Sequence, residues 1–454
     1  MKYEQLLERI DSMIKKAKWP GDIYTYPHAN AFKKVNVDIE KLWEKAQDIN
    51  LYVHIPFCAH KCSYCGLLSC AVGKNGCDTI DTYLLALERE IKFYCSILPK
   101  STHVTDIFIG GGTPNILNFD QQKRLIHVLE DSFNFSFKEI RSCFECNPEL
   151  ISEAQIKLLT DLGVQRISVG MQSFKQDELE LSNRAFDPPQ IEKVANWCHK
   201  YDLDFNLDLI MGLPNQTADN LWYNLEKAIA LNPQSITVYQ FEVVRGTPFS
   251  KQDINIILDN RMKYELYPSL ITYMESHGYI AQSNNSFIRK KDLQPKMYLK
   301  VGSMDPKIPT LGLGAGARSY AEDVHYGMRY SVEPSLVREI IKEYISTEPE
   351  DLQHFGVTLS LDEKKRKYVI LTLTDGGIDL NDYNNRFQSD FKKDFKDEFL
   401  VLKDKEFIQE KNQEIFLTKM GLTYADIIAM LFCSMEMQKR YNQALIMSMR
   451  EAKS

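Results

Sequence analysis

The chain has 454 residues, of which 44% are hydrophobic and 26% are charged, and its formal net charge is −7. This length suits two or three domains, and the composition is that of a folded globular protein rather than a disordered or collagen-like chain. The acidic balance argues against general nucleic-acid binding, which needs a basic surface. No apolar run approaches the length that spans a bilayer, and residues 1–19 read as a charged amphipathic helix rather than a targeting peptide. We therefore expect a cytoplasmic protein that binds neither nucleic acid nor membrane.

Short apolar, β-branched stretches alternate with helical segments between residues 50 and 280. Strands are predicted at Leu51–Pro56, Val104–Gly110, Ile140–Glu145, Gln165–Gly170, Leu203–Leu209 and Ser235–Phe241. Helices are predicted at Asp78–Leu98, Asp120–Phe133, Ser152–Leu162, Pro189–Lys200, Asp219–Leu231 and Asp259–His277. This alternation predicts an α/β fold with a parallel sheet, either open or closed into a barrel.

Five of the ten cysteines lie between Cys58 and Cys77, directly after the first predicted strand. A disulfide scaffold would be short and rich in cysteine throughout, so metal or redox chemistry is the better interpretation. The spacing Cys58-x3-Cys62-x2-Cys65 places three thiolates on one short loop, which suits an iron–sulfur cube with one iron left open. Cys70 could supply a fourth ligand, so zinc is the alternative.

The other cysteines have simpler interpretations. Cys70 and Cys77 could serve a second cluster, but free thiols are favoured because the loop they share is short. Cys143 and Cys146 form a C-x2-C pair on a predicted strand, where they point to opposite faces, so packing is favoured. His54, in the strand that enters the cysteine loop, is expected to make a structural hydrogen bond to that loop.

Glycine and polar residues follow the predicted strands at their carboxyl ends, where parallel βα barrels assemble their active sites. Gly110–Gly112 would let backbone amides approach a polar ligand. Glu145 and Asp208 could accept hydrogen bonds from ribose hydroxyls or an ammonium group, and Arg184 could pair with a carboxylate.

The stretch Leu51–Cys65 resembles the cluster motif of radical S-adenosylmethionine (SAM) enzymes, and more narrowly that of the group containing oxygen-independent coproporphyrinogen III dehydrogenase. Further segments fit that group in order: Gly110–Pro114, Arg166–Phe174, Asp208–Thr217, Tyr239–Pro248 and Leu311–Ala317. The resemblance covers roughly residues 50 to 435.

The resemblance implies a partial (β/α)6 TIM-like barrel over residues 50–280, preceded by a helical and extended segment over 1–49. A connecting region with the glycine-rich Leu311–Ala317 segment would follow over 281–360. Residues 361–454 combine helices with two short β runs in Glu406–Thr418 and a predicted final helix at Tyr424–Met437. This order favours a smaller winged-helix-like α+β domain. Its acidic and basic residues are equal in number, so a lid over the radical site is favoured over DNA binding.

Carried over residue by residue, the resemblance implies that Cys58, Cys62 and Cys65 ligate a [4Fe-4S] cluster, whose fourth iron chelates SAM. Reduction would split SAM into methionine and a 5′-deoxyadenosyl radical that abstracts hydrogen. A flavodoxin or ferredoxin is the expected electron donor. The residues expected to contact SAM are Tyr52, Tyr64, Gly111, Gly112, Thr113, Glu145, Gln172, Arg184, Asp208, Tyr239 and Gln240, with Tyr52 also assigned to catalysis.

Three departures from the pattern bear on the reaction. Leu67 stands where the coproporphyrinogen enzyme has a further cysteine, and Ser283–Lys291 lacks the His-Asn-x-x-Tyr-Trp stretch of the heme-chaperone branch. The segment Tyr24–His28 resembles the class C methylases, which use a second SAM as a methyl or methylene donor. We therefore expect a methylase-like enzyme acting on a small unsaturated, aromatic or tetrapyrrole substrate. The alternatives are oxidative decarboxylation of coproporphyrinogen III and a non-catalytic heme chaperone.

Overall fold

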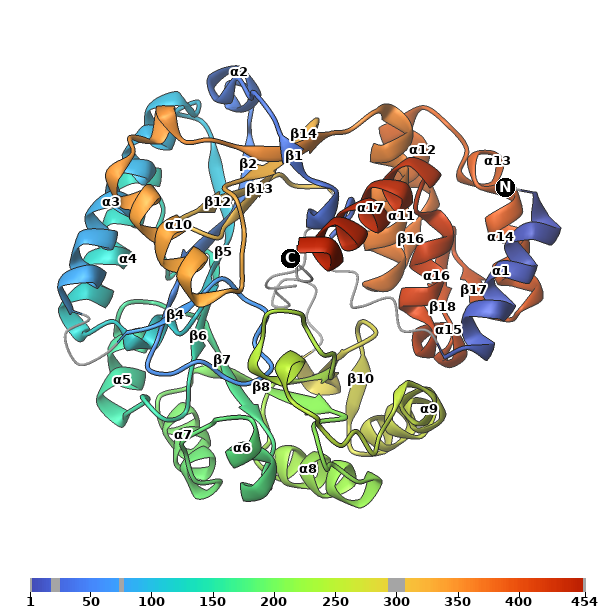
Figure 1. The fold of residues 1–454 in the computed structure, drawn as a ribbon, viewed down its shortest axis with the longest axis horizontal. Coiled ribbons are helices and arrows are strands. Elements are labelled where there is room, and N and C mark those ends of the chain that lie inside the picture. The colour runs from blue at the N-terminus through green and yellow to red at the C-terminus, as the bar shows by residue number, and fades with distance from the viewer. Residues whose placement is uncertain (1, 18–24, 73–76, 293–306, 452–454) are drawn as a thin grey trace.

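The computed structural model describes residues 2–17, 25–72, 77–292 and 307–451 (Figure 1). A thirteen-stranded sheet forms its centre, and the middle of this sheet is a run of six parallel strands. These strands are β2 (Asp48–Ile55), β5 (His103–Gly111), β6 (Arg141–Cys146), β7 (Arg166–Gln172), β8 (Asp204–Met211) and β9 (Ser235–Gln240). All six predicted strands are thus confirmed, with small shifts at their ends.

Helices connect the parallel strands and cover the outer face of the sheet (Figure 1). They are α3 (Cys77–Ile97), α4 (Phe119–Phe133), α5 (Glu153–Asp161), α6 (Gln176–Leu181), α7 (Pro189–Lys200), α8 (Ala218–Ala230) and α9 (Asn260–Ser276). Several begin at a side chain that caps the first turn, such as Ser152, Thr217 and Asp259. Among the helices of the described residues, none is long and apolar enough to cross a lipid bilayer.

The sheet continues beyond the six strands on both sides instead of closing into a full barrel. On one side β12 (Thr310–Leu313) runs parallel to β2, with Gly312 opposite Tyr52, and antiparallel strands extend the sheet from there. These are β13 (Arg318–Tyr320), β14 (Val324–Gly327), β15 (Phe355–Thr358) and β1 (Lys33–Lys34). On the other side β11 (Ser286–Arg289) and β10 (Tyr279–Ala281) pair with β9. Residues 281–360 therefore contribute strands to the sheet itself.

A second hydrophobic core lies beside the barrel and joins the two ends of the chain. Helix α1 (Tyr3–Lys15) buries Leu6 and Ile10 against the C-terminal helices, so this N-terminal helix packs with residues 357–437 (Figure 1). The remaining short elements of residues 25–352 are η1 (Ala29–Ala31), α2 (Ile39–Trp43), β3 (Phe57–Cys58), β4 (Cys70–Ala71), η2 (Pro114–Ile116), η3 (Pro248–Lys251), η4 (Lys290–Asp292), α10 (Pro334–Ser346) and η5 (Pro349–Asp351).

The C-terminal region has the predicted order of helices, a β-hairpin and further helical structure, and it also contains the short strand β16, which the sequence did not predict. Its elements are α11 (Leu361–Thr374), β16 (Ile378–Asp379), α12 (Leu380–Phe387), α13 (Phe391–Asp394), α14 (Lys396–Asp404), β17 (Ile408–Lys411), β18 (Glu414–Leu417), α15 (Lys419–Thr423), α16 (Ala425–Phe432) and α17 (Met435–Glu451). Asn412 and Gln413 both have positive φ, which is typical of the tight turn of a two-residue hairpin.

The predicted continuous helix Tyr424–Met437 is wrong. Helix α16 ends at Phe432, Cys433 is extended, and α17 begins at Met435. Ser434 starts the new helix because its Oγ accepts a hydrogen bond from the Met437 amide at 3.2 Å. The break turns α17 toward the barrel (Figure 1).

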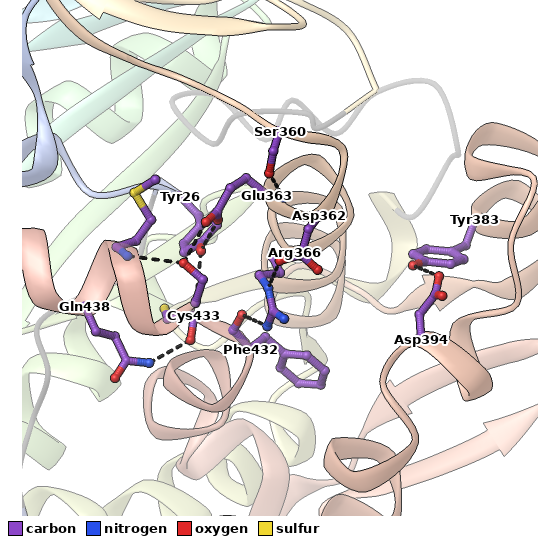
Figure 2. Close-up of polar contacts among 12 residues, drawn as sticks. Tyr26, Ser360, Asp362, Glu363, Arg366, Tyr383, Asp394, Phe432, Cys433 and Gln438 are labelled. Carbon is purple, nitrogen blue, oxygen red and sulfur yellow. Dashed lines mark hydrogen bonds and ion pairs between the residues drawn. The ribbon is translucent and has the colours of Figure 1, made fainter. Parts of the chain in front are cut away.

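A buried carboxyl group joins three distant segments at this break (Figure 2). Glu363, on α11, accepts a hydrogen bond from the Tyr26 hydroxyl and another from Ser434 Oγ at 2.6 Å. The Tyr26 oxygen in turn accepts a hydrogen bond from the Ser434 amide at 3.0 Å. Tyr26 therefore links the N-terminal segment to both α11 and the start of α17.

We expect Tyr26→Phe to lower the free energy of unfolding by about 1–3 kcal/mol, because it leaves Glu363 and the Ser434 amide each short of a buried partner. Urea unfolding measures the loss, and hydrogen exchange should quicken in α17. Tyr3→Phe is the matched control, since the Tyr3 hydroxyl meets Asp404 at the exposed surface. Equal stability of the two variants would contradict the role given to Tyr26.

Candidate active site

A cavity of about 1810 Å³ lies at the carboxyl ends of the parallel strands. It is bounded by the barrel on one side and by α17 with the Thr25–His28 segment on the other. All the predicted site residues line it: Tyr52, Cys58, Cys62, Tyr64, Cys65, Gly111, Gly112, Thr113, Glu145, Gln172, Arg184, Asp208, Tyr239 and Gln240. Their location is thus established, while their individual roles stay predictions.

The cysteine loop is held by backbone contacts from two sides. Its ends are joined by β3 and β4, which pair in parallel. The Ser63 amide donates to the carbonyl of Ser182 at 3.0 Å, and the Phe249 amide donates to the carbonyl of Ser63 at 3.0 Å. Asn183 Nδ2 donates to the Lys61 carbonyl at 2.8 Å. The loop conformation therefore depends on the end of α6 and on η3.

The three thiols suit a cluster better than a single metal ion. Cys58 is buried, while Cys62 and Cys65 are partly exposed to the cavity. Within residues 2–17, 25–72, 77–292 and 307–451, no three His, Cys, Asp or Glu side chains converge closely enough to hold one ion. Three soft sulfur donors around an open cavity fit a [4Fe-4S] cluster with one accessible iron. Burial raises the pKa of the Cys58 thiol to about 12, so iron binding must displace its proton.

Arg184 lies beside the thiols and is nearly buried. Its Nη1 donates to Cys62 Sγ at 3.3 Å, its Nη2 donates to the Gly170 carbonyl, and its Nε lacks a hydrogen-bond partner in the structure. Gln172 and Gln240 each present a buried Oε1 that also lacks one. Buried polar atoms are rarely left unpaired, so these three groups indicate a polar ligand in the cavity.

The glycine loop differs from its predicted use. The expectation that the amides of Gly110–Gly112 approach a ligand is wrong for Gly111 and Gly112, because their amides, like that of Thr113, already donate within the protein. Their acceptors are Glu145 Oε2 at 2.9 Å and the carbonyls of Ile55 and Phe57 at 2.8 Å. Glycine is needed because a Cβ on Gly110 would lie 2.7 Å from Glu145 Oε2 and one on Gly111 would lie 2.7 Å from the His54 ring. The loop thus supports Glu145 and His54.

Glu145 and Asp208 are two buried carboxyl groups that face the cavity. Burial and then the charge of Asp208 raise the pKa of Glu145 to about 8, while burial raises the pKa of Asp208 to about 6. Asp208 accepts hydrogen bonds from Asn206 Nδ2 at 2.7 Å and from Ser168 Oγ at 3.1 Å. Both groups can accept hydrogen bonds from a polar ligand that enters the cavity.

The raised pKa of Glu145 predicts a pH dependence of stability. Between about pH 4.5 and pH 8 the folded protein holds a proton on Glu145 that the unfolded chain has lost, so the free energy of unfolding falls as pH rises through this window. Glu145→Gln should remove this decrease in the free energy of unfolding. Without the cluster, we expect the variant to be more stable than wild type near pH 8 and as stable as wild type near pH 4.

Urea unfolding across this range measures the effect, with the exposed Glu139→Gln as the control. A Glu145→Gln variant that kept the wild-type slope would contradict the assignment.

Aromatic side chains complete the wall near the cysteines. Tyr52 stacks on Phe108 with ring centroids 5.9 Å apart and donates its hydroxyl hydrogen to His54 Nδ1 at 2.9 Å. His54 Nε2 then donates to the Leu68 carbonyl at 2.8 Å, which is the structural hydrogen bond predicted for it. Tyr64 and Tyr239 flank a small apolar cluster made by Ile210, Leu213, Phe241 and Phe249.

The cysteines that the structure describes form no disulfide bond with one another. Cys70, Cys143 and Cys146 are buried, in keeping with packing, and Cys146 also reaches the cavity. The side chain of Cys77 lies outside the described residues.

Several residues that line the cavity were not predicted from the sequence. Arg318 and Tyr320 enter from β13 and Tyr330 from the segment after β14, while Cys433 enters from the break before α17 and Tyr441 from α17. Arg318 follows the Leu311–Ala317 segment directly, but nothing in the local pattern marks it as part of the site.

Comparison with known proteins agrees with this site. Residues 52–228 match the family described as the Radical SAM superfamily. The heme chaperone HemW of Bacillus subtilis is 30% identical over 279 residues, which cover 59% of this chain and 70% of that protein. The oxygen-independent coproporphyrinogen III oxidase of Helicobacter pylori is 26% identical over 420 residues, 85% of this chain and 87% of that enzyme.

The solved structure of coproporphyrinogen III oxidase (HemN) from Escherichia coli has the same fold. It superposes with a TM-score of 0.74 at 24% identity and covers 90% of this chain and 96% of that one. The match to the Salmonella typhimurium oxidase, at 33% identity, spans only about half of each protein, 52% of this chain and 52% of that enzyme.

The chain therefore belongs to the radical SAM superfamily. Within the superfamily it falls in the group of the coproporphyrinogen III oxidases and HemW-type heme chaperones. The partial α/β barrel is confirmed by this fold. The relatives named above are oxidases and a chaperone, so the predicted closeness to class C methylases gains no support from them.

Proposed function

We propose that this protein is a radical SAM enzyme that abstracts a hydrogen atom from a substrate of porphyrinogen size. The observation that carries the proposal is the loop of Cys58, Cys62 and Cys65 opening into a cavity of about 1810 Å³. Pockets for one small ligand usually measure about 300–1000 Å³, so this cavity has room for SAM and a second, larger molecule.

The residues that line the cavity have different proposed roles, which follow from their chemistry. The three cysteines hold the [4Fe-4S] cluster, and Arg184 offers a cation next to Cys62 where a carboxylate of SAM would be stabilised. Glu145, Asp208 and Gln172 offer acceptors for ribose hydroxyls and an ammonium group. With cluster and SAM bound, one-electron reduction splits SAM and supplies a carbon radical that takes hydrogen from the substrate.

The C-terminal helices supply the shielding that such chemistry needs. Met430, Cys433, Met437 and Tyr441 line the cavity opposite the cysteine loop. Excluding water there protects a reactive radical from side reactions. The electron that starts the reaction would come from a small low-potential carrier such as flavodoxin or ferredoxin.

The names of the relatives favour oxidative decarboxylation of coproporphyrinogen III as the reaction, because oxidases of that substrate match up to 85% of this chain. A heme chaperone without turnover is the second candidate, since HemW of Bacillus subtilis covers 59% of the chain at 30% identity. Methyl transfer is the third, and it rests on the Thr25–His28 segment reaching the cavity.

One anaerobic experiment separates these candidates. The protein is reconstituted with iron and sulfide, then given SAM, dithionite and coproporphyrinogen III. Substrate-dependent 5′-deoxyadenosine with carbon dioxide release indicates decarboxylation, whereas substrate-dependent S-adenosylhomocysteine indicates methyl transfer. A heme titration of the same protein completes the test, because stoichiometric heme binding without any 5′-deoxyadenosine would overturn the enzymatic proposal and favour the chaperone.

A further inference from the structure

Arg318 is a cation on the cavity wall with an unusual set of neighbours. Its guanidinium lies over the Tyr330 ring, 4.5 Å from the ring centroid, and it hydrogen-bonds to the Tyr320 phenol. In the part of the chain that the structure describes, no carboxylate lies within ion-pair distance of it, unlike the paired Arg124, Arg141 and Arg329. The titratable groups that interact electrostatically with Arg318 are all phenols or imidazoles. They belong to His28, Tyr52, His54, Tyr320 and Tyr330.

The stacking partner fixes this guanidinium relative to the cysteine loop. The Tyr330 hydroxyl donates to the Gly66 carbonyl at 3.0 Å and accepts from the Leu68 amide at 2.9 Å. The Leu68 carbonyl accepts from His54, which also accepts from Tyr52. A continuous set of hydrogen bonds therefore joins Arg318's stacking ring to the residues directly after Cys65.

Other segments of the chain also enclose the part of the cavity where Arg318 lies. The residue lies on β13 and lines the cavity together with Thr25, His28 and Tyr441. His28 and Tyr441 meet edge to face with ring centroids 5.1 Å apart, so the N-terminal segment and α17 meet on this side of the cavity. An anion held here is partly removed from water, which strengthens a charged hydrogen bond.

We propose that Arg318 anchors a carboxylate group of the substrate, so that the bound acid orients the molecule against the cysteine loop. The inference rests on the proposed function and adds to it the residue that would hold and orient the carboxylate of the substrate. Guanidinium suits this role because its planar fork binds a carboxylate through two hydrogen bonds while its face stays stacked on the tyrosine.

The carboxylate that binds Arg318 could belong to the substrate or to SAM, since the cavity has room for both. Arg184 already occupies the position next to Cys62, whereas Arg318 stacks on Tyr330, whose hydroxyl bonds to Gly66 and Leu68 after Cys65. Because Arg184 already offers a cation to the SAM carboxylate, we assign Arg318 to the substrate, and the experiment measures both ligands.

The test compares wild type with Arg318→Gln and Arg318→Lys, each reconstituted with its cluster. Equilibrium dialysis with labelled SAM gives one affinity, and fluorescence titration with a tetracarboxylic porphyrin gives the other. We expect Arg318→Gln to weaken porphyrin binding by about ten- to a hundredfold and to leave SAM binding within about twofold of wild type. Arg318→Lys should fall between, because it keeps the charge and loses the fork. Arg289→Gln is the control, since Arg289 is bound to Asn232 away from the cavity.

A tetra-amide of the same porphyrin separates charge from shape. It should bind wild type and Arg318→Gln equally, because it lacks the carboxylates. A loss of SAM affinity with unchanged porphyrin affinity would assign the guanidinium to SAM and overturn the inference. Unchanged affinity for both ligands would overturn it as well.

Failure of the proposed function would look different. If wild type does not bind the porphyrin at all, the proposal of a porphyrinogen-sized substrate is wrong. The role of Arg318 is then tested by whether a simple dicarboxylate protects it from chemical labelling. Phenylglyoxal labels accessible arginines, and peptide mass spectrometry reads each site. Protection of Arg318 by glutarate, with Arg289 unprotected, would retain the carboxylate anchor, whereas equal labelling with and without glutarate would overturn it.

Discussion

Replacing Cys58, Cys62 or Cys65 by alanine is expected to remove the cluster and to reduce 5′-deoxyadenosine formation below detection. Each thiol is one of the three that the loop presents to the cavity, and a cube held by two ligands loses both stability and its open site. Iron and sulfide content after anaerobic reconstitution gives the first measurement, and SAM cleavage under dithionite gives the second.

Cys70→Ala is the matched control for these three variants. Cys70 is also buried and lies in β4, which closes the same loop, but it belongs to the packed end of that loop. We expect this variant to keep its iron and its SAM cleavage. Loss of iron in Cys70→Ala would instead make it a fourth ligand and revive the alternative of a four-thiolate site. A Cys58→Ala protein with a full, active cluster would refute the ligand assignment.

The second large effect is expected at Glu178, a fully buried residue of α6 that no sequence pattern singled out. Its carboxyl group accepts hydrogen bonds from four side chains of the loop after β7, the loop after β8 and helix α8. These donors are Ser173 Oγ at 2.7 Å, Gln216 Nε2 at 2.8 Å, Asn220 Nδ2 at 2.9 Å and Asn224 Nδ2 at 3.4 Å.

Glu178→Ala leaves these donors buried without their common acceptor and opens a cavity in the core. We expect the free energy of unfolding to fall by about 3–5 kcal/mol, which urea unfolding measures directly. Cluster retention should fall too, because α6 ends at the residues that bind the cysteine loop, where the Ser182 carbonyl accepts from the Ser63 amide.

Glu180→Gln is the control for this prediction, since Glu180 lies on the exposed side of the same helix and accepts a hydrogen bond from Gln176 Nε2. A change there is expected to leave stability and iron content close to wild type. If Glu178→Ala unfolds at the same urea concentration as Glu180→Gln, the four-donor arrangement does not hold these loops together.

The sequence by itself determined the six parallel strands, the helices between them except α6, and the three-cysteine loop. Each of these signals is local: apolar periodicity separates strands from helices, capping residues such as Thr217 mark helix starts, and Cys58-x3-Cys62-x2-Cys65 is readable within eight residues. Because parallel strands present their carboxyl ends on one side, even the meeting of Glu145 and Asp208 followed from the pattern.

Only the tertiary structure decided which segments surround the six parallel strands and the cysteine loop. The strands β12 to β15 are three or four residues long, too short to show a period, and their pairing joins residues far apart in sequence. Arg318 thereby reaches the cavity, and Leu6 comes to share a core with the C-terminal helices. The break before α17, the pKa of Glu145 and the bonded amides of the glycine loop likewise depend on burial and on partners from other segments. Long-range packing sets such properties, and no local pattern in the chain encodes them.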